Sequence, residues 1–91
     1  MGRHPVVVVT RDSAIPVLNQ LVVALITSTV RDLPTEVAVG PRQGLSRESV
    51  INCDNLFTIP RAVLGRRRGQ LEPTELRSLD AALAIALGID F

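Results

Sequence analysis

The chain has 91 residues, 46% of them hydrophobic, and a net charge of only +1. This length fits a single domain over residues 1–91, and the apolar content excludes a disordered chain. One cysteine and one histidine exclude an internal disulfide and a zinc site, so we expect no metal or other cofactor.

The first half of the chain contains three segments that predict strands. The valine run at 6–9 favours a strand buried on both faces, and a second buried strand is expected over 21–27. The apolar run 21–26 is far below the roughly 20 residues that cross a bilayer. With no secretory signal either, we expect a cytoplasmic protein without a membrane span. Asp32 and Pro34 then mark a turn, and the alternation over 35–39 predicts a half-exposed strand.

The second half predicts short elements and then a helix. Strands are expected over 49–53 and 56–59 with a break at 54–55, then a helical turn over 60–64 and a last strand over 67–71. Pro73 suits the first position of a helix that Gly88 ends, with Leu76, Leu79, Leu83 and Leu87 on one stripe. The pattern predicts a mainly β fold, a compact antiparallel β-barrel closed by a C-terminal helix.

Two further expectations concern the surface and the start of the chain. The surplus of apolar residues suggests another buried surface, most simply a homodimer interface. Residues 1–4 lead directly into the first buried strand, with nothing before it to pair with or cover it. We therefore expect a shortened version of a longer parent that places a strand there.

The most promising chemistry follows the second strand. Thr27 is the first hydroxyl after an apolar run, and Ser28, Thr29 and Arg31 come directly behind it. Hydroxyls beside an arginine can bind a phosphate and stabilise charge that develops on it. A polar turn whose hydroxyls bond to local backbone groups explains the same residues.

Three other groups leave two interpretations open. His4, next to Arg3, can act as an acid or base near neutral pH, or it can be a solvated terminal residue. Asp54 and Asn55 can read base edges, or they can occupy an ordinary turn. The arginines at 66–68 can follow a phosphate backbone, or they can protect an exposed edge strand.

Four segments resemble the MazF/PemK family of bacterial toxin endoribonucleases, especially its mycobacterial type. They are HPVVVVTRD at 4–12, ALITSTVRDLPTEV at 24–37, SVINCDNLFTIP at 49–60, and ALGI at 86–89. The resemblance implies an SH3-like barrel, a homodimer, and a cognate antitoxin whose C-terminal segment blocks the RNA groove. It also implies metal-independent, sequence-specific cleavage of single-stranded RNA, in which the ribose 2′-hydroxyl attacks the phosphate. The products are a 2′,3′-cyclic phosphate and a 5′-hydroxyl.

The resemblance also assigns roles to individual residues. Thr27 stabilises the phosphate in the transition state, Ser28 and Arg31 face the RNA, and Asn55 contacts bases with Asp54 beside it. The family's catalytic arginine directly precedes the proline of the first strand. Here that position is His4, and the arginine is one residue earlier, at Arg3.

This substitution is open to three interpretations. His4 transfers the proton, or Arg3 reaches into the site, or the protein is a weak or inactive member that still dimerises and binds an antitoxin. A gyrase-poisoning relative of the same fold and a plain structural module are two further hypotheses for the function.

Overall fold

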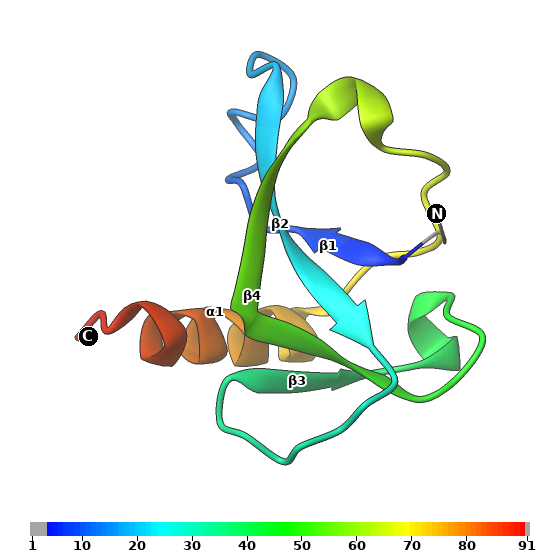
Figure 1. Ribbon diagram of the computed structural model, residues 1–91, viewed down its shortest axis with the longest axis vertical. Coiled ribbons are helices and arrows are strands. Elements are labelled where there is room, and N and C mark those ends of the chain that lie inside the picture. The colour runs from blue at the N-terminus through cyan, green and yellow to red at the C-terminus, as the bar shows by residue number, and fades with distance from the viewer. Residues whose placement is uncertain (1–3, 91) are drawn as a thin grey trace.

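A computed structural model describes residues 4–90 and shows an antiparallel sheet with a C-terminal helix (Figure 1). The strands are β1 (Val6–Val8), β2 (Gln20–Thr27), β3 (Glu36–Val39) and β4 (Ser49–Pro60), and the helix is α1 (Pro73–Leu87). Two short 3-10 turns, η1 (Pro41–Gln43) and η2 (Arg61–Val63), follow β3 and β4. The strand order is β1-β2-β4-β3, and the sheet curls into a half-barrel. The mainly β fold with a closing helix is confirmed.

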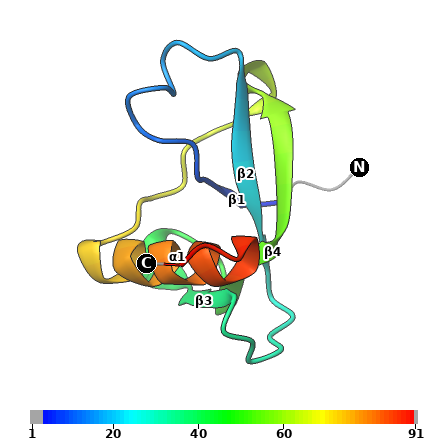
Figure 2. The same ribbon diagram turned by 90° about the vertical axis from the view of Figure 1, so that its left-hand side faces the viewer.

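Helix α1 lies against one side of the curled sheet (Figure 2). Leu79 and Ala82 of the helix share one buried cluster with five sheet residues: Ala24, Val37, Val39, Ile51 and Cys53. The helix starts and ends where the sequence predicts, with the Glu72 amide donating to the Glu75 carboxylate and Gly88 at φ 68°. Of the predicted leucine stripe, Leu79 is buried under the sheet and Leu83 packs against the same cluster, whereas Leu76 and Leu87 at its two ends are exposed in the single chain.

Strand β4 is one continuous strand, so the prediction of two strands with a break was wrong. Its pairing with β2 jumps from Ala24–Leu56 to Leu25–Asn52, which leaves residues 53–55 without partners on β2. An insertion of this kind is a β-bulge, which bends a strand without ending it. Figure 1 shows β4 bending sharply along its length. The turn-favouring pair Asp54-Asn55 is therefore accommodated inside the strand.

Two other predicted strands differ from the structure. Strand β1 is half-buried rather than buried on both faces, because it lies at the sheet edge and pairs only with β2. Segment 67–71 is irregular rather than a strand. There the backbone at Gly69 passes so close to the Gln43 carbonyl that a Cβ would lie 2.2 Å from its oxygen. This crossing of two glycine-containing segments replaces a strand ladder.

Candidate active site

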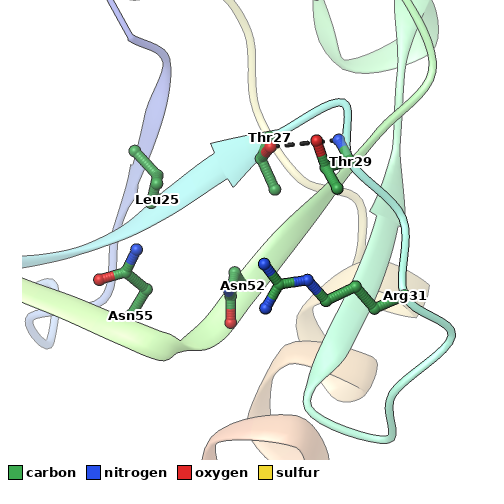
Figure 3. Close-up of a pocket in the computed structure, with 6 residues that line it drawn as sticks. All are labelled: Leu25, Thr27, Thr29, Arg31, Asn52 and Asn55. Atoms are coloured by element: carbon green, nitrogen blue, oxygen red, sulfur yellow. Dashed lines mark hydrogen bonds between the residues drawn. The ribbon is translucent and has the colours of Figure 1, made fainter.

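An open pocket of about 160 Å³ lies where β2 ends beside the bulge of β4 (Figure 3). The residues that line it come from β2, the following loop and β4: Leu25, Thr27, Thr29, Arg31, Asn52 and Asn55. Figure 3 shows the Arg31 side chain extending from the loop toward Asn52. The pocket therefore joins residues that are up to 30 positions apart in the sequence.

Strand geometry places this pocket on the sheet face opposite α1. Successive side chains on a strand point to opposite faces. Ala24 and Ile26 contribute to the cluster under the helix, so Leu25 and Thr27 point away from it. On β4, Asn52 lies between the core residues Ile51 and Cys53 and likewise points away. The pocket thus has the sheet as its floor.

The hydrogen bonds around the pocket decide which atoms remain free for a ligand. The Thr29 amide donates to the Thr27 hydroxyl oxygen at 3.1 Å, which leaves the hydroxyl proton of Thr27 available. The Asp54 amide donates to Asn52 Oδ1 at 3.0 Å, which leaves the amino group of Asn52 available. The Arg31 guanidinium carries donors only. Thr27, Arg31 and Asn52 therefore offer hydrogen-bond donors to the pocket, and none of its six lining residues is acidic. This arrangement suits an anion such as phosphate.

The structure brings together some of the residues predicted from the sequence and separates others. Thr27, Arg31 and Asn55 line the pocket, whereas Ser28 and Asp54 do not. Asp54 instead accepts a 2.5 Å hydrogen bond from the Thr35 hydroxyl through Oδ2. Segment 66–68 does not line the pocket either.

The N-terminal candidates lie beside the pocket or outside the described residues. The Ile26 amide donates to the Pro5 carbonyl at 3.1 Å, and Val6 pairs with Leu25. Continuing this antiparallel register places His4 opposite Thr27, at the strand edge nearest the pocket. His4 is exposed and does not line the pocket. Arg3 lies outside the described residues.

Sequence reasoning did not select three of the pocket residues. Leu25 carried no signal, because it is one of several apolar residues in its strand. Thr29 was noted among the hydroxyls but was not assigned a role. Asn52 had a usable signal: it is a lone amide in the otherwise apolar run 50–53. A polar side chain at that position of a strand has to reach the opposite face.

The lone cysteine is not a nucleophile for this site. Burial raises the pKa of the Cys53 thiol from 9.0 to about 11, and the negative charge of the adjacent Asp54 adds to the effect. The thiol is therefore neutral at physiological pH, and its side chain is only 1% exposed. Within residues 4–90, no three or more His, Cys, Asp or Glu side chains gather as a metal site would require. No described helix is long and apolar enough to span a membrane.

The fold and the pocket together define a small curled-sheet protein with a site complementary to an anion. Residues 1–87 match the family described as the PemK-like, MazF-like toxin of type II toxin-antitoxin systems. The chain belongs to this family.

Known proteins resemble the chain over nearly its whole length. Endoribonuclease MazF3 of Mycobacterium tuberculosis H37Rv is 47% identical, over 97% of this chain and 82% of that protein. The solved structure of Mycobacterium tuberculosis toxin MazF-mt6 is 42% identical, with a TM-score of 0.93, over 97% of this chain and 89% of that one. A mycobacterial endoribonuclease solved in complex with its cognate antitoxin is 31% identical, with a TM-score of 0.89, over 99% and 85% of the two chains.

Proposed function

We propose that this protein is the toxin of a type II toxin-antitoxin system and cleaves single-stranded RNA as a metal-independent endoribonuclease. Its relatives are named endoribonucleases, which supports the reaction class. The observation that carries the proposal is the convergence of three donors on one pocket: the Thr27 hydroxyl, the Arg31 guanidinium and the Asn52 amino group.

The reaction assigned to this pocket is an internal transfer at phosphorus. The 2′-oxygen of the ribose attacks the adjacent phosphorus, and the bond from phosphorus to the 5′-oxygen breaks. The 2′-hydroxyl loses its proton and the departing 5′-oxygen gains one, which gives a 2′,3′-cyclic phosphate and a 5′-hydroxyl. Negative charge grows on the other phosphate oxygens during the attack. Donors already fixed toward those oxygens stabilise it most effectively, which is the role of Thr27 and Arg31.

We assign the proton transfer to His4. An imidazole accepts and donates protons near neutral pH, and the β1–β2 register, if continued from Val6 to residue 4, would set His4 opposite Thr27. The His4→Ala variant should therefore lower the cleavage rate at least about 100-fold. Arg3 is the competing candidate. Lost cleavage in Arg3→Ala, together with wild-type cleavage in His4→Ala, would assign the step to Arg3 instead.

The direct test is incubation of purified protein with a mixed RNA in EDTA, followed by mapping of the new ends. We expect cyclic-phosphate and 5′-hydroxyl ends. Thr27→Ala should lower the rate by about 10²–10³-fold, the usual cost of removing one transition-state donor. Thr58→Ala is the matched control, because Thr58 is exposed elsewhere on β4 and does not line the pocket. A folded protein that leaves RNA intact, or cuts it only when a divalent metal is added, would refute the proposal.

Ser28, Asp54 and Asn55 complete the proposed RNA-binding surface. Asn55 lines the pocket, and Ser28 and Asp54 flank it as chain neighbours of lining residues. Because base contacts affect recognition more than chemistry, Asn55→Ala should change which RNA sequences are cut more than it lowers the maximum rate of cleavage. Deep sequencing of cleavage sites in a random RNA pool would measure this. An unchanged sequence preference would exclude Asn55 as a base contact.

We further propose that the protein forms a homodimer and binds a cognate antitoxin in the cytoplasm, with the C-terminal segment of the antitoxin in the RNA groove. Loop 11–19 and η2 carry large exposed apolar side chains: Val17 is 74% exposed and Val63 is 65% exposed. The Arg61 guanidinium binds the Ile15 carbonyl at 2.8 Å, which joins the two segments. Val63→Arg should convert a dimer into monomers in light scattering, and wild-type protein that is monomeric at micromolar concentration would refute the assembly.

A further inference from the structure

We infer that Thr35 and Glu36 are positioning residues that hold the two walls of the pocket, the loop bearing Arg31 and the β4 bulge, in one arrangement. The inference rests on the proposed function for its kinetic consequences. Neither residue lines the pocket, so neither touches the substrate there. Both act through hydrogen bonds to the segments on either side.

Glu36 holds the first wall. Residues 28–34 between β2 and β3 are all exposed, so apolar burial contributes little to fixing this loop. One carboxylate oxygen of Glu36, Oε1, accepts hydrogen bonds from the backbone amides of Arg31 at 3.0 Å and Leu33 at 3.3 Å. The Glu36 amide in turn donates to the Leu33 carbonyl at 3.0 Å. The loop is thus folded back onto the first residue of β3, and this fold sets where the Arg31 side chain begins.

Thr35 holds the second wall. Its side chain is buried, and its hydroxyl donates to Asp54 Oδ2 at 2.5 Å. Its carbonyl accepts from the Cys53 amide at 3.0 Å. Cys53 and Asp54 belong to the bulge, where β2 offers no partners. Thr35 therefore supplies the bonds that this irregular part of β4 lacks on its other side.

The contacts of Glu36 and of Thr35 both lead to Asn52. Glu36 is the direct cross-strand partner of Asn52, whose side chain accepts from the Asp54 amide. A chain of contacts thus runs from the Arg31 backbone through Glu36 to the strand of Asn52, and from Asn52 through Asp54 to Thr35. A displacement of about 1 Å at a catalytic group can cost about 10²-fold in rate. Holding both walls through adjacent residues limits such displacement.

Glutamine and alanine at position 36 separate positioning from charge. Glu36→Gln keeps an oxygen where Oε1 accepts, and it replaces Oε2, which is buried and has no hydrogen-bond partner among the described residues. Glu36→Ala removes the acceptor. We expect the Arg31 and Leu33 amides to exchange with solvent at least about tenfold faster in the alanine variant, and at wild-type rates in the glutamine variant, by NMR. Equal exchange in all three proteins would overturn the inference, whatever the protein does to RNA.

Kinetics on folded protein give the second readout. Glu36→Ala should lower kcat/KM for RNA cleavage about 10- to 100-fold, mainly through kcat, while Glu36→Gln stays within about threefold of wild type. In an Arg31→Ala background, Glu36→Ala should have little further effect, since the residue it positions is gone. Additive losses, or a lower melting temperature with unchanged kcat/KM, would show a merely structural role. If Arg31→Ala alone leaves cleavage unchanged, the proposed site fails, yet the amide-exchange result still stands.

Thr35 is tested with a matched pair of its own. Thr35→Val keeps the shape but removes the hydroxyl, and Thr35→Ser keeps the hydroxyl. The valine variant should free the Asp54 carboxylate and speed exchange of the Asp54 amide, while the serine variant preserves wild-type exchange and cleavage. Identical behaviour of the two variants would contradict the role assigned to the hydroxyl.

Discussion

The change in stability of this protein between about pH 9 and 11 should come from a single side chain, Cys53. The chain has no tyrosine and no lysine, and its ten basic residues are all arginine. Arginine stays charged above pH 12, and an N-terminal amine titrates near pH 8. Between about pH 9 and 11, the thiol is therefore the one side chain that changes charge.

The size of the effect follows from the pKa of the thiol. Burial first, and the charge of Asp54 second, raise that pKa from 9.0 to about 11 in the folded protein. Below pH 9 the thiol is protonated in the folded and unfolded states alike, so its full contribution to stability is present. As the pH rises through 9 toward 11 the unfolded state releases its proton first, and stability falls by about 2 kcal/mol over this range, out of a total of about 2.7 kcal/mol at 1.36 kcal/mol per pKa unit. The loss is complete only once the folded thiol is also ionised, well above pH 11. A domain of this kind has only about 5–15 kcal/mol in total.

Urea unfolding at pH 7, 9, 10 and 11 measures this loss. Far-ultraviolet circular dichroism is the suitable signal, because the chain contains neither tryptophan nor tyrosine. Cys53→Ala is the control: it lowers stability at neutral pH by leaving a small cavity, but its stability should stay level from pH 9 to 11. A wild-type curve that is flat over this range, or a parallel decline in the alanine variant, would refute the reasoning.

Three further predictions concern the core, a glycine and the pocket. Ile51 is fully buried, so Ile51→Ala should lower the free energy of unfolding by about 2–5 kcal/mol in urea titrations. Gly44 has φ +91°, and a Cβ added there would lie 2.1 Å from the Arg68 carbonyl oxygen, so Gly44→Ala should lower the free energy of unfolding by more than about 1 kcal/mol. A Cβ added at Gly65 would meet open space, so Gly65→Ala should change the free energy of unfolding by less than about 0.5 kcal/mol. Asn52→Asp places a carboxylate among the donors of the pocket and should lower RNA affinity at least about tenfold in filter binding, with the fold intact.

Each of these predictions has a clear contrary outcome. Ile51→Ala at wild-type stability would mean that the cluster under α1 is not the core. Equal effects of alanine at positions 44 and 65 would contradict the close backbone crossing near Arg68. Unchanged RNA binding in Asn52→Asp would place the phosphate outside this pocket.

The sequence predicted the regular elements well where side-chain periodicity was strong. The alternation at 35–39 and the helix from Pro73 to Gly88 are confirmed, because burial of one face leaves a repeat that can be read locally. Segment 53–55 misled the prediction. Asp54 and Asn55 look like a turn, and only the missing partners on β2 show that they form a bulge inside a strand.

The candidate site likewise contains some residues that could be selected from the sequence and others that only the structure reveals. Thr27 and Arg31 could be selected from the sequence because a hydroxyl at a strand end and a nearby arginine are local signals. The contribution of Asn52 depends on pairing between β2 and β4, and the contacts of Thr35 and Glu36 depend on the path of an exposed loop. Neither leaves a local pattern in the chain.

By itself, the sequence determined the C-terminal helix, the strands with clear apolar patterns and the short stretch that could bind phosphate, because these follow from residue type and spacing. Only the tertiary structure decided that a three-residue bulge brings Asn52 and Asn55 beside Thr27, and that Thr27 and Asn52 keep donor groups free there. The physical reason is that register and hydrogen-bond direction are set between distant segments. A pocket is complementary to an anion only after those partners have been assigned.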